Sequence, residues 1–90
     1  MSTMRRWRVD VFVDEIDDRT THAEARLFTD DETHLVGRGQ ARRDPHDRAV
    51  PEVGDEIAAG RALLDLAHAL LGAAEADVEQ LTHERFRLHE

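Results

Sequence analysis

The densest run of basic side chains lies between residues 37 and 48, and the guanidinium group is well suited to recognising phosphate. Its arginines could contact the backbone of a nucleic acid. The alternative interpretation is structural: the glycines of this run would let a helix pack closely on a strand, and the arginines would pair with Asp44 and Asp47. Both interpretations stay open at this point. The candidate phosphate-binding residues are Arg38, Arg42, Arg43 and Arg48.

Catalytic and metal-binding chemistry has few candidates in this sequence. Ser2 is the only serine, and the chain has no cysteine, no tyrosine and no glycine-rich phosphate loop. The six histidines are scattered without metal-ligand spacing. The acidic turn at 14–18 lacks the glycine and the final glutamate of a calcium loop. We therefore expect no enzyme activity, no cofactor, no metal and no small-molecule substrate.

Length and charge narrow the class of protein further. Ninety residues allow one small domain, and a formal charge of −8 opposes non-specific binding to nucleic acid, so any phosphate contact must be local. All 12 basic residues are arginine. No uninterrupted apolar run approaches the roughly 20 residues of a membrane helix, and the N-terminus does not resemble a signal peptide. We expect a cytoplasmic protein with no membrane contact.

The elements that must position these residues follow from hydrophobic periodicity. Period-two alternation occurs three times with short turns between, which predicts an antiparallel meander. The period then changes to a broad apolar stripe at helical spacing. The sequence predicts a single two-layer α+β domain over residues 1–90, a meander packed on one long helix. Its expected elements are strands at about 7–14, 20–28 and 33–42, a loop at 43–54, a helix at about 55–71 and a short strand or tail at 84–88.

The two faces of the predicted sheet differ in side-chain size. One face is lined by alanine and glycine in its second and third strands, which would let the leucine-rich helix approach closely. The other face is mostly charged but carries three apolar residues, and two more near the C-terminus could cover them from the same chain or from a second copy. We therefore expect a homodimer. The expected interface residues are Phe12, Phe28, Val36, Phe86 and Leu88.

One long stretch resembles a known family. Residues 44–56 read DP-x-D-x-x-VP-x-V-GDE, and Trp7–Val11 and Leu35–Gly39 fit the same pattern. The sequence resembles a small actinobacterial family of unknown function that includes mycobacterial dormancy-associated proteins. The resemblance implies an antiparallel sheet with a long helix, often dimeric, similar to double-stranded-RNA-binding and ribosome-hibernation domains. It implies no catalytic or binding residues.

The matching residues also have structural interpretations. Pro51 and Gly54 fit the start of a helix, and Arg61 and Asp65 form an i,i+4 pair on its solvent side. Two functions follow as hypotheses. The first is a non-catalytic stress or dormancy protein that binds a macromolecule, with the ribosome suggested by the resemblance. The second is an acidic protein–protein adaptor that makes no contact with nucleic acid.

Overall fold

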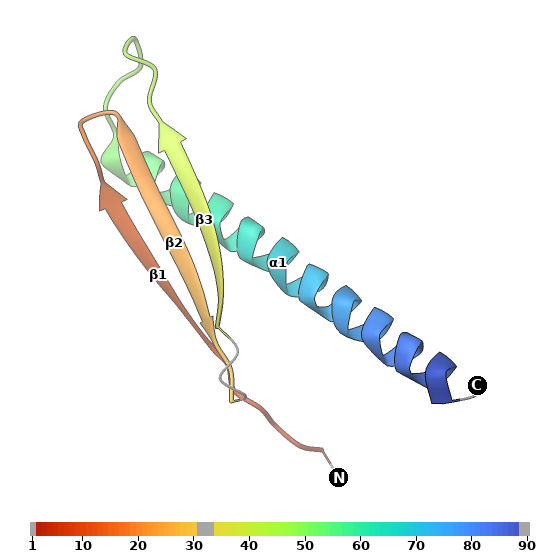
Figure 1. Ribbon diagram of the computed structural model, residues 1–90. Helices are drawn as coiled ribbons and strands as arrows, with labels where there is room; N and C mark the ends of the chain where they lie inside the picture. The colour runs from red at the N-terminus through yellow and green to blue at the C-terminus, as the bar shows by residue number, and fades with distance from the viewer. Residues whose placement is uncertain (1, 31–33, 89–90) are drawn as a thin grey trace.

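The computed structural model describes residues 2–30 and 34–88, with the side chains of the helix described as far as His83. Three strands form one antiparallel sheet in the order β1-β2-β3, and a single helix follows them. Figure 1 shows the helix crossing one face of the sheet. The predicted meander packed on one long helix is confirmed. The elements are β1 (Arg8–Glu15), β2 (Thr20–Phe28), β3 (His34–Arg42) and α1 (Pro51–Leu88).

The core lies where α1 crosses β2 and β3, and it consists almost entirely of small residues. The buried side chains come from alternate positions of the strands and from every fourth position of the helix, as the two periods require. The predicted small-residue face is therefore the face that receives the helix. The core residues are Ala23, Ala25, Leu27, Ala41, Ala58, Ala62 and Leu66.

Two glycines of β3 set the distance between the sheet and the helix. A Cβ atom at Gly37 would lie 2.7 Å from the Cα of Leu66, and one at Gly39 would lie 2.8 Å from the carbonyl carbon of Arg61. Real Cβ atoms do not approach backbone that closely, so helix backbone occupies the space that a side chain would need. The contact is thus backbone against backbone. The helix face that meets the sheet carries Ala58 and Ala62 together with Leu66, whereas the leucines at 63 and 64 are exposed.

The edge of β3 is tied to α1 by two polar side chains. Asp65 accepts a hydrogen bond from the main-chain N–H of Arg38 at 2.8 Å, and Arg61 donates one to the carbonyl oxygen of Gln40 at 2.7 Å. The expectation that Arg61 and Asp65 pair with each other on the solvent side of the helix is therefore wrong. The close approach of α1 brings both side chains within reach of β3, an edge strand whose outward backbone groups pair with no other strand in the described part of the chain.

The helix is much longer than the expected 55–71. It begins at Pro51, a position where the missing N–H of proline costs nothing, and runs through Gly72 to Leu88. The segment 84–88 is thus helical and not a fourth strand. Leucine, alanine and glutamate on both sides of Gly72 favour helix enough to offset the cost of one glycine, about 1 kcal/mol.

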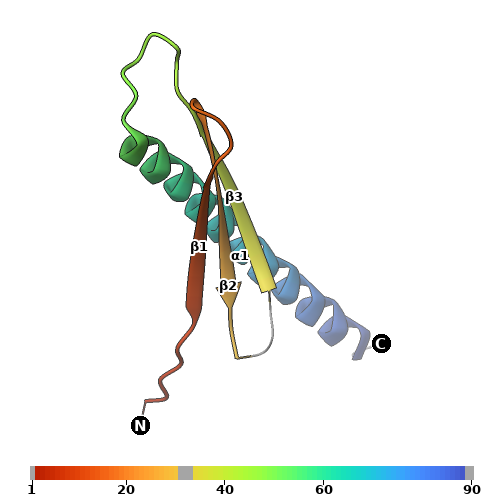
Figure 2. The same cartoon turned by 90° about the vertical axis from the view of Figure 1, so that its left-hand side faces the viewer.

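The long helix gives the molecule an extended shape. Its C-terminal half continues past the end of the sheet, as Figure 2 shows. The Cα radius of gyration is 18.5 Å, with extents of 64 × 32 × 19 Å. A compact domain of this length has a radius of gyration near 12 Å. The difference means that much of α1 has no intramolecular packing partner among the described residues.

The diagonal course of α1 also leaves β1 largely uncovered. Val9, Val11 and Val13 point to the same side of the sheet as the buried alanines, yet each is at least 40% exposed. The helix contacts β2 and β3 extensively and β1 only slightly. The valines of β1 are therefore exposed because α1 crosses the sheet over β2 and β3, and not because β1 lacks apolar residues.

Candidate nucleic-acid interface

The face of the sheet that points away from α1, here called the outer face, carries most of the functional candidates. Its side chains are the even-numbered residues of the three strands, and the strand register sets them in rows across the sheet. Charged and polar residues surround two phenylalanines in these rows. Four rows cross all three strands, and Thr20 and Arg42 form a fifth across β2 and β3. The four are Arg8–Phe28–His34, Asp10–Arg26–Val36, Phe12–Glu24–Arg38 and Asp14–His22–Gln40.

Each phenylalanine of the outer face lies beneath an arginine. The guanidinium carbon of Arg26 is 4.9 Å from the centre of the Phe12 ring, and that of Arg8 is 4.7 Å from the centre of the Phe28 ring. His34 meets the Phe28 ring edge-on, with 5.5 Å between the centroids. These cation–π pairs hold flat, positively charged groups on an open sheet. The sequence analysis missed Arg8 and Arg26, because only the cross-strand register shows which rings they cover.

The expected apolar patch on this face is not continuous. The row containing Asp10 and Arg26 lies between Phe12 and Phe28, and Val36 sits at the far end of that row. Phe12 is 51% exposed, whereas Phe28 and Val36 are half-buried among polar neighbours. The helical positions 86 and 88 have side chains outside the described residues. The outer face is therefore a mixed aromatic and charged surface.

Glu24 organises the charges at the centre of the outer face. Its carboxylate pairs with the guanidinium of Arg26 at 2.6 Å and with that of Arg38 at 3.3 Å. A shallow hollow lies beside it, lined on the outer face by Phe12, His22 and Arg38 among others. Glu24 thus links Arg26 on its own strand, β2, to Arg38 on β3. Arg38 thus belongs to this surface and retains donors that face solvent.

The outer face differs in charge from the rest of the chain. Among its residues, arginine at 8, 26, 38 and 42 contributes +4, and the acids at 10, 14 and 24 contribute −3, for a formal sum of +1. The whole chain carries −8, so all other residues together carry −9. The positive charge that the sequence analysis placed at 38–48 is in fact spread over three strands.

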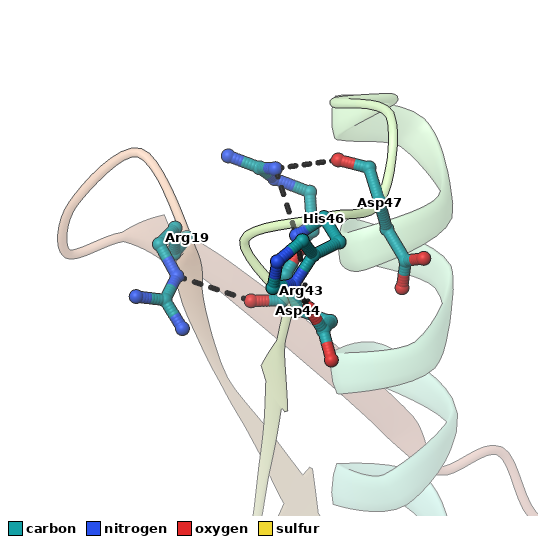
Figure 3. Close-up of polar contacts among 5 residues, drawn as sticks. All are labelled: Arg19, Arg43, Asp44, His46 and Asp47. Atoms are coloured by element: carbon teal, nitrogen blue, oxygen red, sulfur yellow. Dashed lines mark hydrogen bonds and ion pairs between the residues drawn. The ribbon is translucent and has the colours of Figure 1, made fainter.

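The four arginines of the predicted cluster do not converge. Arg38 and Arg42 lie on the outer face of β3, and Arg48 is exposed in the loop before α1. Arg43 faces the loop instead, where its Nη1 donates to the carbonyl oxygen of Asp47 at 2.6 Å. Figure 3 shows that this side chain closes the loop over its own backbone. Arg43 therefore has a structural role, as the structural interpretation of this arginine run predicted. It bonds to the main-chain oxygens of Asp44 and Asp47, however, and not to their carboxylates.

The loop that carries the DP-x-D sequence is fastened to the turn between β1 and β2. The main-chain N–H of Arg43 donates to the oxygen of Arg19 at 2.8 Å, and the Arg19 Nε donates back to the oxygen of Arg43 at 3.1 Å. Asp44 accepts a hydrogen bond from the main-chain N–H of His46 at 2.9 Å, which closes a turn around Pro45. The first part of the motif behind the family resemblance, Asp44 to His46, thus has a structural role in this loop.

Hydrogen bonds within the two turns lower the pKa of two exposed carboxyl groups. The main-chain N–H of His46, together with its ring, lowers the pKa of Asp44. The main-chain N–H of Arg19 lowers the pKa of Asp17 in the β1–β2 turn. Both turns are stabilised by the ionised aspartate. Neither carboxyl group has the raised pKa that a general acid near neutral pH would need.

The structure brings no metal-ligand set together in the described part of the chain: no three His, Asp or Glu side chains there lie close enough to hold an ion. A separate finding concerns α1. Over 51–83 this helix is long and apolar enough, by length and composition alone, to cross a membrane. The sequence analysis overlooked this stretch, because Arg61 and Asp65 interrupt the apolar run and the helix was expected to end at 71.

The meander, the diagonal helix and the mixed outer face define a small α+β protein with an open sheet surface. The chain belongs to the Rv2632c-like family, whose sequence model matches residues 5–87. It is 45% identical over 85 residues to the uncharacterized protein Mb1767 of Mycobacterium bovis, covering 94% of this chain and 88% of that protein. It is 44% identical over 77 residues to the uncharacterized protein Rv2632c of Mycobacterium tuberculosis, covering 86% and 81%. The crystal structure of Rv2632c superposes with a TM-score of 0.81 at 40% identity, covering 91% of this chain and 95% of that one.

Proposed function

We propose that this chain is a non-catalytic binding protein that contacts RNA, with the ribosome as the candidate assembly, through the outer face of its sheet. The observation that carries the proposal is the pairing of Arg26 with Phe12 and of Arg8 with Phe28 on a sheet face that no described element covers. Aromatic rings and guanidinium planes on an open antiparallel sheet are the groups on which unpaired bases stack.

Charge supports the same surface. The outer face sums to +1 within a chain of −8, so on average it repels a polyanion less than the rest of the chain does. Such an arrangement favours one docking orientation and suppresses non-specific binding. A role in stress or dormancy and a likeness to ribosome-hibernation domains belong to the same proposal and come from the family resemblance alone.

The test is co-sedimentation of the tagged protein with ribosomes from starved or oxygen-limited host cells at two salt concentrations. We expect co-migration that weakens with salt and that disappears in the double variant Arg38→Glu/Arg42→Glu. Arg5→Glu/Arg6→Glu is the matched control: it makes the same change in charge in the exposed segment before β1 and should leave co-migration intact.

Two other results would count against the proposal. Protein that stays at the top of the gradient at both salt concentrations overturns ribosome association. Equal loss in the two double variants would mean that net charge alone, not the outer face, governs the interaction.

A second candidate is the acidic adaptor, which the −9 carried by the rest of the chain favours. In this case a basic protein would bind away from the outer face, and its capture would survive nuclease treatment and weaken with salt. The Arg38→Glu/Arg42→Glu variant would then capture the partner as well as the wild type does.

A further inference from the structure

The face of α1 opposite the sheet carries a continuous heptad pattern that nothing in the described part of the chain covers. Apolar or small residues recur there at alternating spacings of three and four, the pattern of a coiled-coil seam. This set is called the seam from here on. It consists of Ile57, Gly60, Leu64, Ala67, Leu71, Ala74, Val78 and Leu81.

The seam is distinct from the face that builds the core. The core positions Ala58, Ala62 and Leu66 point toward the sheet, whereas every seam residue is exposed. Its larger side chains are 42–63% exposed. The seam spans 25 residues, about 36 Å of helix. It includes the part of α1 that projects beyond the sheet in Figure 1, so a partner helix can approach without meeting a strand.

Large and small residues alternate strictly along the central part of the seam. One of the two heptad positions holds Leu64, Leu71 and Val78, and the other holds Gly60, Ala67 and Ala74. Two parallel copies would stack leucine on leucine and alanine on alanine, and would leave voids at each small layer. An antiparallel copy sets each large side chain against a small one. The Leu–Ala layers then have equal volumes, and the Val–Gly layers flanking them are smaller by two carbon atoms.

We infer that α1 binds a second copy of this chain along the seam, with the two helices antiparallel. The arrangement centres near residue 69. It places Leu64 against the partner's Ala74, Leu71 against the partner's Ala67 and Val78 against the partner's Gly60. Glycine and alanine allow the two helix backbones to approach closely, as they do at the sheet on the opposite side of α1.

Charge at the border of the seam fits the same register. The antiparallel pairing brings Arg61 of each chain beside the partner's Glu75, so two opposite-charge contacts form, one toward each end of the interface. Arg61 uses one nitrogen of its guanidinium for the bond to Gln40 and keeps others for this contact. The dimer expected from the sequence would thus form through α1, leaving the outer face free for the proposed RNA contact.

The first test is the oligomeric state of the full chain by analytical ultracentrifugation. Wild-type protein is expected to be dimeric, and Leu71→Glu should raise the dissociation constant at least about 100-fold, because a charge would be buried without a partner. Leu71 does not touch the sheet, so circular dichroism should show an intact fold. Phe12→Glu is the matched control on the outer face and should leave the dimer unchanged.

The second test uses the absence of cysteine from the chain. Oxidation of a mixture of Ala67→Cys and Leu71→Cys proteins should give the disulfide between the two variants in preference to either variant with itself. Disulfides of Ala67→Cys with itself would point to parallel helices and overturn the antiparallel pairing.

Three outcomes contradict the dimer outright. A wild-type chain that is monomeric at tens of micromolar has no stable seam partner. Dissociation by Phe12→Glu but not by Leu71→Glu would move the interface to the outer face. A monomer that floats with phosphatidylcholine–phosphatidylglycerol vesicles, and loses this property in Leu71→Glu, would show that the seam meets lipid instead, consistent with the apolar length of α1.

Discussion

The carboxylate of Asp65 accepts a hydrogen bond from the main-chain N–H of Arg38, with 2.8 Å between the Oδ2 and nitrogen atoms. One helical turn earlier, Arg61 reaches the carbonyl oxygen of Gln40 at 2.7 Å. The two side chains satisfy backbone groups that an added strand would otherwise use. The helix therefore both packs on the sheet and closes one of its edges.

The first prediction concerns the hydrogen bond between Asp65 of α1 and the main chain of β3. Asp65→Ala should lower the free energy of unfolding by about 1 kcal/mol, because the N–H of Arg38 loses its charged acceptor. Asp65→Asn retains an acceptor oxygen and should lose about half as much. Urea denaturation measures both, with Asp77→Ala, on the projecting part of α1, as the control. Equal values for Asp65→Ala and Asp77→Ala would show that the bond to β3 contributes no stability.

The second prediction concerns the distance between α1 and the sheet. Gly39→Ala should destabilise the protein by about 2 kcal/mol or more, since the new methyl group would enter the backbone of the helix. Gly72→Ala is the matched control, because a Cβ there meets no atom within 4 Å. It should stabilise the helix by about 0.5–1 kcal/mol. A tolerated Gly39→Ala would mean that α1 can shift away from β3 at little cost.

The third prediction separates the two roles found among the arginines. Arg43→Ala should lower the free energy of unfolding by about 1 kcal/mol and the Tm by about 4–8 °C, because the loop loses the hydrogen bond from the Arg43 guanidinium to the carbonyl oxygen of Asp47. Arg48→Ala, in the same loop, should stay within about 0.5 kcal/mol of the wild type. Thermal unfolding followed by circular dichroism distinguishes the two. If Arg43→Ala unfolds at the wild-type temperature, the hydrogen bond from Arg43 to the Asp47 oxygen does not stabilise the fold.

The fourth prediction is a pH dependence. The pKa of Asp44 is lowered in the folded state from its ordinary value of 3.8, so its stabilising effect is complete above that value. The effect is lost as the pH falls through the lower, folded pKa. The difference in Tm between the wild type and Asp44→Ala should therefore be constant near neutral pH and shrink in acid. Asp18→Ala, in the β1–β2 turn, removes the same charge as a control; a gap that widens in acid would contradict the assignment.

Much of the fold could be predicted from the sequence because its signals are local. Alternation fixed the three strands to within a residue or two, and the small residues at 23, 25, 37 and 39 identified the face that receives the helix. The end of α1 could not be predicted in the same way. The predicted helix ended at 71, just before Gly72, yet a single glycine costs less than the flanking helix-forming residues gain.

The candidate site was less predictable, because it depends on pairing between strands. Arg43 is one residue from Arg42 and looks equivalent to it in the sequence. The period of two sends Arg42 to the outer face and turns Arg43 toward the loop. The stacking of Arg26 on Phe12 likewise needs the register of β1 against β2. The residues that share the outer face could therefore not be identified from the spacing of the arginines along the sequence alone.

The length of α1 beyond the sheet has a consequence for hydrogen exchange along one continuous helix. Amides near Ala58 and Ala62 open only when the helix leaves the sheet, so they should exchange as slowly as the strands do. Amides past Gly72 have no such anchor within the described chain, and their protection can come only from what covers that part of the helix. Hydrogen exchange along α1 would then report two free energies. Amides before Gly72 would report the free energy of unfolding of the domain, and amides after Gly72 would report the free energy of binding whatever covers that part of the helix.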